Sequence, residues 1–216
     1  MIASGIVLIS TFIALLAFAL STFLLYLKYP KSRIVKLLAL YFAFFFFGLI
    51  VTSLRNKIPN FISLQLGVVS FAIGYMFLYM AIKHMLGLES NWQRRYYIPI
   101  TILFMGIFLF TYMYYDLHMR IVIFSLYIAV YTFVTAWLLY ESSVKYYKRF
   151  HQFIALFYLI ISFVFILRAI NSSIFGYHLQ VFYSNTFIIN SPYISLIIIS
   201  LILIIMSNLH LRYIKN

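Results

Sequence analysis

The feature that most constrains this chain is a series of long apolar runs separated by short segments that carry basic residues. A helix that crosses a bilayer needs about 20 mostly apolar residues, and seven runs reach or approach this length. They cover residues 3–27, 34–54, 61–86, 96–115, 120–140, 151–171 and 191–210. We therefore expect an all-α, polytopic membrane bundle of seven transmembrane helices, forming a single domain over residues 1–216.

The first run resembles a secretory signal peptide, but its charge pattern is wrong for one. No basic residue precedes it, whereas Lys28, Lys31 and Arg33 follow it, and it is longer than the apolar region of a signal peptide. We interpret residues 3–27 as a retained first span.

The basic residues also predict how the chain is oriented, because cytoplasmic loops are enriched in Lys and Arg. In a seven-span bundle, one side holds only Arg55, Lys57, Arg120 and Arg168. The other side holds twelve of the sixteen basic residues. The twelve are Lys28, Lys31, Arg33, Lys36, Lys83, Arg94, Arg95, Lys145, Lys148, Arg149, Arg212 and Lys215. We expect the N-terminus outside, the C-terminus in the cytoplasm, and a location in a bacterial inner membrane.

Several chemical classes are excluded by the residues that are missing. The sequence has no cysteine and only three acidic residues, Glu89, Asp116 and Glu141, too few for two-metal or paired-carboxylate catalysis. All five histidines fall at span ends or in connections, which disfavours haem, and the last run has no lysine for a retinal Schiff base. We expect no enzyme activity, no metal, no cofactor and no nucleic-acid partner.

Arg168 is the residue that first suggests a binding site. It lies 15 residues beyond Phe153, near which the sixth span enters the membrane, so it sits about 22 Å along a hydrocarbon core that is about 30 Å thick. A charge at that depth is costly unless it is compensated. Arg55 ends the second run and Arg120 opens the fifth, so all three arginines belong to the outer end of the bundle.

One acidic residue, Asp116, accompanies these arginines. If the fifth helix begins early, Asp116 and Arg120 form an i,i+4 pair, with Tyr112 one turn above. The planar guanidinium of arginine suits carboxylate and phosphate. We predict that Arg55, Arg120 and Arg168, with Tyr112 and Asp116, bind a small anionic ligand or a lipid headgroup. Arginines near span ends also reach phospholipid phosphates with no further ligand, and this alternative stays open.

A family resemblance covers roughly residues 35–175. A glycine in the second run, Gly48, is followed by Arg-x-x-Ile-Pro at 55–59, and the stretch "TYMYYDLHMRIVIFSL" (111–126) and Leu167-Arg168 continue the pattern. The arrangement resembles the seven-span N-terminal sensor region that precedes GGDEF domains in bacterial diguanylate cyclases. The resemblance implies a role for Arg55, Arg120 and Arg168 in ligand binding or signalling, without naming the ligand.

From this resemblance we expect a sensory input module that relays binding through its last helix to a cytoplasmic output of the diguanylate cyclase type. That output is absent from this chain and would be fused or separate, and a homodimer would pass the signal. The alternatives are a small transporter or lipid-handling protein, and a structural scaffold in the bilayer. Whether loop 172–192 forms a lid over the ligand is open. Gly67 and Gly74, with Ser63 and Ser70, predict close helix packing in the third span.

Overall fold

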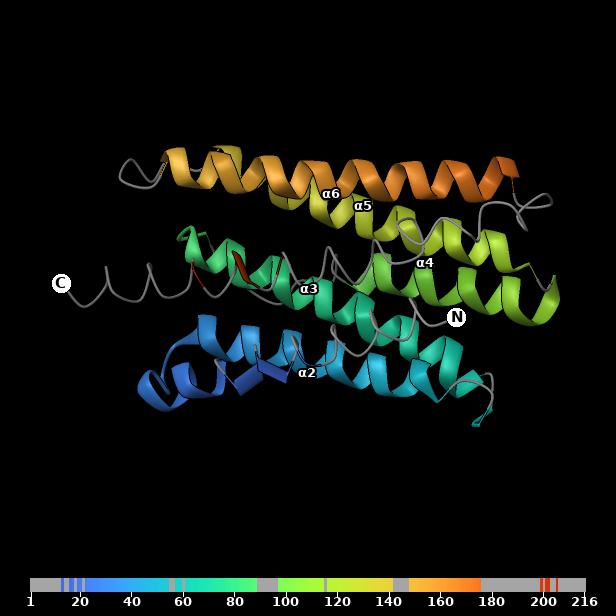
Figure 1. Cartoon of the computed structure of the whole chain (residues 1–216), viewed down its shortest axis with the longest axis horizontal. Helices are drawn as coiled ribbons and strands as arrows, with labels where there is room; N and C mark the ends of the chain where they lie inside the picture. The colour runs from blue at the N-terminus through green and yellow to red at the C-terminus, as the bar shows by residue number, and fades with distance from the viewer. Residues whose placement is uncertain are drawn as a thin grey trace.

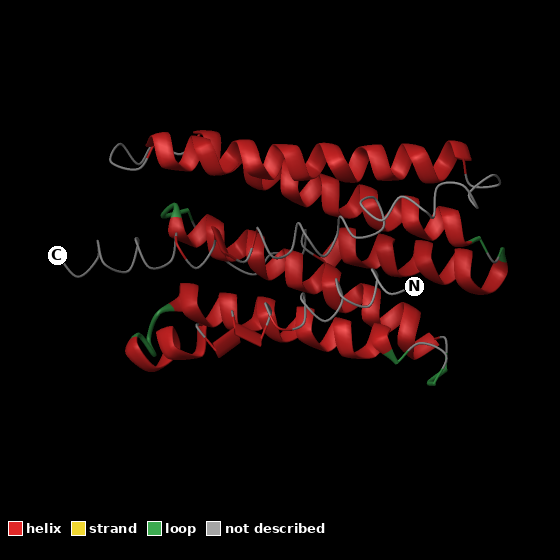
Figure 2. Ribbon diagram, viewed as in Figure 1, coloured by secondary structure: helices red, strands yellow, loops and turns green. Residues whose placement is uncertain are grey.

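The described part of the chain is all-helical (Figure 2). The structure, a computed structural model, describes residues 22–54, 57–59, 61–88, 97–114, 116–141 and 148–175, with positions 13, 16, 17, 19, 20, 199, 201, 202 and 205. Residues 22–28 are helical and precede five α-helices. The five are α2 (Arg33–Ser53), α3 (Gly67–Met85), α4 (Tyr97–Phe108), α5 (Leu117–Glu141) and α6 (Lys148–Phe175). Two π-helical segments adjoin them, η1 (Phe61–Leu66) before α3 and η3 (Leu109–Met113) after α4.

The predicted spans agree closely with these helices. The second to sixth predicted spans each coincide with a described helix, and the ends differ by at most four residues. Four described helices, beginning at Arg33, Ser63, His118 and Lys148, are long and apolar enough to cross a bilayer, and a shorter apolar helix covers Ile98–Met113. The all-α class is therefore confirmed for this part of the chain, and four of its helices are candidate membrane spans. The first and last spans lie mostly outside the described residues, so the number seven and the orientation stay predictions.

Two antiparallel helix pairs organise the bundle (Figure 1). The most extensive contacts join α5 to α6 and α2 to α3, while α3 and α4 both contact α5. Figure 1 shows α6 along one edge, α2 along the opposite edge and α3 between them. At the right of this view α2, α4 and α6 end and α3 and α5 begin; we call this the Asp116 end. The opposite end carries the turn between residue 28 and α2, and we call it the Lys31 end.

Glycines let α2 and α3 approach closely, as the small-residue pattern predicts. A Cβ atom on Gly74 would lie 2.5 Å from Cδ2 of Phe45, and one on Gly67 would lie 2.6 Å from Cγ2 of Thr52. Neither distance leaves room for a side chain. A Cβ atom on Gly48 would likewise lie 3.0 Å from Cε1 of Phe71. The expected close packing of this helix pair is confirmed.

Aromatic side chains fill the core, and apolar side chains also cover its outside. The buried cluster includes Tyr41, Phe45, Tyr158 and Phe165, each no more than 2% exposed. The surface of α6 that faces away from the bundle exposes large apolar side chains at helical spacing. They are Phe153, Leu156, Leu159, Ile160, Phe163, Ile166, Leu167, Ile170 and Ile174. An apolar surface of this extent needs lipid or another protein to cover it.

Candidate functional site at the start of α5

Asp116 caps the N-terminus of α5. Its Oδ1 atom accepts hydrogen bonds from the backbone N–H groups of His118 at 2.8 Å and Met119 at 3.1 Å. These are the second and third residues of the helix, whose N–H groups have no partner within the helix itself. The negative carboxylate also lies at the positive end of the helix dipole. Asp116 therefore fixes where α5 begins.

Arg120 lies one turn further along α5 and is buried. The side chain is 7% exposed, and its Nε atom donates a 3.3 Å hydrogen bond to the backbone carbonyl oxygen of Asp116. The i,i+4 relationship that the sequence predicts is present, because α5 begins at Leu117. The contact uses the Asp116 carbonyl oxygen, while the carboxylate caps the helix. The Nη1 atom of Arg120 is buried as well.

Arg168 reaches the same end of the bundle from α6. Ser172 donates a 3.2 Å hydrogen bond to the His118 carbonyl oxygen, and Ser162 donates a 2.9 Å bond to that of Ala129. These two bonds set the antiparallel register, which places Arg168 level with position 122. It is thus only about 3 Å deeper along the axis than Arg120. The Nη1 atoms of Arg168 and Arg120 are both buried, and the two residues lie at nearly the same level on neighbouring helices.

Gln65 is a fully buried polar residue that sequence reasoning missed. Its Nε2 atom donates a 2.6 Å hydrogen bond to the Phe104 carbonyl oxygen, and its Oε1 atom has no hydrogen-bond partner in the described structure. The position of Gln65 along the bundle axis follows from a hydrogen bond nearer the Lys31 end. There the Tyr127 hydroxyl donates a 3.0 Å bond to the Ala72 carbonyl oxygen. Gln65 and Arg120 each lie seven residues before that contact on helices that run the same way. They are therefore at one level.

Both π-helical segments occur at this end of the bundle. η1 contains Gln65, and η3 contains Thr111, whose hydroxyl donates a 2.6 Å bond to the Ile107 carbonyl oxygen. Single π-helical turns inside longer helices are frequent at functional sites. The sequence signal for these residues was weak: an isolated glutamine and an isolated threonine in apolar runs carry no motif.

The structure describes only some of the other predicted site residues. Arg55 lies outside the described residues, as do positions 176–192 of the loop whose role as a lid is open. Tyr112 is described, and its ring packs against Phe108 with centroids 5.1 Å apart. It is 46% exposed, so it stands at the surface rather than beside the buried Arg120. Arg120, Arg168 and Asp116 are brought to one end, as predicted.

No protein-family model, curated protein or solved structure matches this chain. The resemblance to the sensor region of GGDEF proteins therefore stays a prediction. No cluster of three or more metal-ligating side chains occurs among the residues that the structure describes. The charged donors of the site are the two guanidinium groups. The Ser172 hydroxyl donates to His118 and the Gln65 amide nitrogen to Phe104, so neither adds to them, and Oε1 of Gln65 is an acceptor. Guanidinium groups suit carboxylate and phosphate oxygens.

Proposed function

We propose that this chain is a membrane-embedded binding module for a small anionic ligand, held at the Asp116 end between α5 and α6. The observation that carries the proposal is the position of two arginines near one level of an apolar bundle, where Arg120 is buried and Arg168 is half-buried with a buried Nη1 atom. Arginine presents a planar fork of donors that matches carboxylate and phosphate oxygens. In this proposal the Asp116 end faces the outside of a bacterial inner membrane.

The charge balance of the site supports an anion. Asp116 is the only acidic residue between positions 90 and 140, and none occurs after Glu141. The site therefore carries two guanidinium groups and one carboxylate, a net positive charge. Positive charge in a low-dielectric surrounding favours uptake of a negative ligand, because attraction is stronger there than in water.

The packing below the site supports sensing over transport. A carrier needs a polar path through both leaflets, whereas here the interior toward the Lys31 end is filled by aromatic rings. Phe71 and Phe124 lie 6.3 Å apart between ring centroids, and the fully buried Tyr158 and Phe165 extend the packing along α6. A ligand that enters from the Asp116 end meets a closed floor. We propose that binding shifts α6 relative to α5 and that the last helix relays this shift to a cytoplasmic output of the GGDEF type, possessed by the same protein or by a partner.

Two assays on the purified protein test this function. Thermal unfolding in detergent is measured across a panel of small carboxylates and phosphate esters, and the expected result is a raised melting temperature with one class of anion. The protein is then placed in liposomes, and uptake of that anion is measured. Binding without uptake is expected. Uptake that requires the protein would show that it is a carrier rather than a sensor. No response to any anion would contradict both functions.

A further inference from the structure

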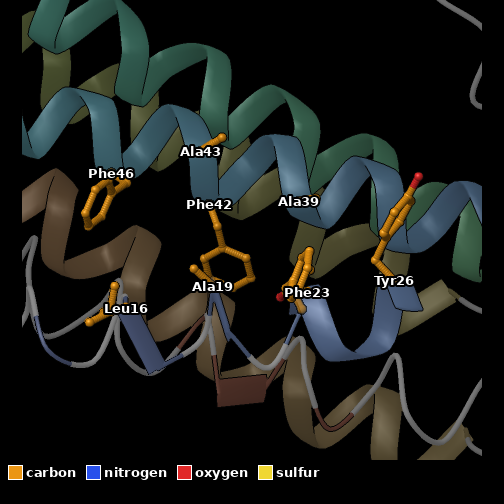
Figure 3. Close-up of a pocket in the computed structure, with 9 residues that line it drawn as sticks. Leu16, Ala19, Phe23, Tyr26, Ala39, Phe42, Ala43 and Phe46 are labelled. Atoms are coloured by element: carbon orange, nitrogen blue, oxygen red, sulfur yellow. The ribbon is translucent and has the colours of Figure 1, made fainter. Parts of the chain in front are cut away.

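An apolar groove lies between the N-terminal helical segment and α2, away from the anion site (Figure 3). Its volume is about 410 Å³, within the roughly 300–1,000 Å³ of typical ligand sites. The lining residues come from both helical segments. They are Leu16, Ala19, Thr22, Phe23, Tyr26, Ala39, Phe42, Ala43 and Phe46. None of them is charged, so the groove suits a hydrocarbon chain rather than a polar ligand.

The groove runs along the two helices. On α2, Ala39, Ala43 and Phe46 recur at spacings of four and three residues, which is one stripe of a helix. In Figure 3, Leu16 and Phe46 stand at one end and Tyr26 and Ala39 at the other. From Ala39 to Phe46 the stripe rises about 10 Å. The small side chains of Ala39 and Ala43 leave this space open, and the rings of Phe23 and Phe46 border it.

Basic side chains lie within one turn of one end of this groove. Lys36 is three residues before Ala39 and so continues the same stripe of α2 by one turn. It is exposed, as are Lys28, Lys31 and Arg33 of the adjoining turn and first helical residue of α2. Beyond the other end, α2 continues from Phe47 to Ser53 without a charged residue. The groove is therefore apolar along its length and cationic at one end.

We propose that the groove holds one acyl chain of an anionic phospholipid, whose phosphate lies against Lys36 and the basic turn at residues 28–33. The apolar lining accepts the chain, and the lysines and arginine supply charge and hydrogen bonds to the phosphate. A zwitterionic lipid offers the same chain without net negative charge. The structure thus assigns preference for the anionic headgroup to the basic residues and retention of the chain to the groove.

Native mass spectrometry of the full chain tests this proposal with two probes, phosphatidylglycerol and phosphatidylcholine of identical chains. The wild-type protein is expected to retain phosphatidylglycerol more strongly. Lys36→Gln, at an exposed position that leaves the fold intact, is expected to weaken that binding about fivefold, the effect typical of one basic residue at an anionic surface. Lys57→Gln, at the Asp116 end, is the matched control and is expected to change nothing.

The groove itself is tested by Ala43→Phe, which fills it. The expected result is loss of retained phosphatidylglycerol, with unchanged binding in Leu40→Phe, whose position on α2 is exposed but does not line the groove. Equal retention of both lipids by the wild type would overturn the role of the basic turn. Unchanged retention in Ala43→Phe would overturn the groove as the site. A change in oligomer mass with Ala43→Phe, at unchanged lipid retention, would assign the groove to a second copy and also overturn the proposal.

Discussion

The Ser172 hydroxyl donates a 3.2 Å hydrogen bond to the backbone carbonyl oxygen of His118 and so joins the end of α6 to the first turn of α5. This bond lies one turn from Arg168 on α6 and two residues from Arg120 on α5. Any ligand that engages both arginines therefore bridges two helices that are already tied together at that level. Removing this bond by mutation therefore tests how the two helices are held together.

Ser172→Ala should loosen this junction. The variant removes one interhelical hydrogen bond, which in membrane proteins is worth about 0.6 kcal/mol on average. The free energy of unfolding in mixed micelles, measured by denaturant titration, should fall by about that amount. Ser53→Ala is the control, because the exposed Ser53 hydroxyl bonds only to the Ile50 carbonyl of its own helix. A larger loss of unfolding free energy in Ser53→Ala than in Ser172→Ala would contradict the role of Ser172 in joining the two helices.

Two substitutions at Asp116 distinguish its structural role from its electrostatic role. Asp116→Ala removes the cap of α5 and should lower stability by about 1 kcal/mol, whereas Asp116→Asn keeps an acceptor for the same N–H groups and should cost little. The asparagine variant also removes the negative charge from the site. It should therefore bind anions more tightly than the wild type, as measured by calorimetry. Weaker binding by Asp116→Asn would mean that the ligand is not an anion.

Gly74→Ala should disrupt the contact of α2 with α3. The new methyl group would lie 2.5 Å from the Phe45 ring, which is itself packed against Tyr41, Phe71 and Tyr75. Overpacking of this kind costs roughly 1–3 kcal/mol. Gly106→Ala is a matched control, because its Cβ would meet the flexible end of Ile123 at 3.0 Å. Thermal unfolding should show the larger loss for Gly74→Ala, and equal losses would contradict the close packing.

The absence of cysteine makes the orientation directly testable. Tyr114→Cys places a thiol at the Asp116 end, where Tyr114 is 72% exposed, and Lys31→Cys places one at the Lys31 end. In intact cells, a membrane-impermeant maleimide should label the Tyr114→Cys variant, while the Lys31→Cys variant should react only after the cells are opened. The reverse pattern would invert the proposed orientation and place the anion site in the cytoplasm.

Sequence reasoning predicted the helices well because apolar length and basic flanks are local signals. The span predicted at 120–140 nevertheless began three residues late, since the capping role of Asp116 depends on the side-chain geometry of one turn. The candidate site was predicted in part. Arg120 and Arg168 stand out as charges in apolar runs, and counting residues placed them at one end.

Gln65 and Ser172 could not be found in the same way. The burial of Gln65 depends on a carbonyl of α4, 39 residues away, and Ser172 depends on a carbonyl of α5, 54 residues away. Neither partner is visible in the local pattern. Tyr112 shows the opposite case, because spacing alone placed it near Asp116, whereas the packing of its ring against Phe108 leaves it at the surface.

The central claim is that Arg120 and Arg168 together hold a small anion, and its most direct test is the dissociation constant of the anion that most raises the melting temperature. Calorimetry is performed on lipid-free protein in a zwitterionic detergent, so that no phospholipid phosphate competes. Removing a charge-assisted hydrogen bond should weaken binding about 10- to 100-fold. We predict that loss for both Arg120→Leu and Arg168→Leu, with wild-type affinity in Lys57→Gln. Unchanged affinity in either arginine variant, with the protein still folded, would contradict the account.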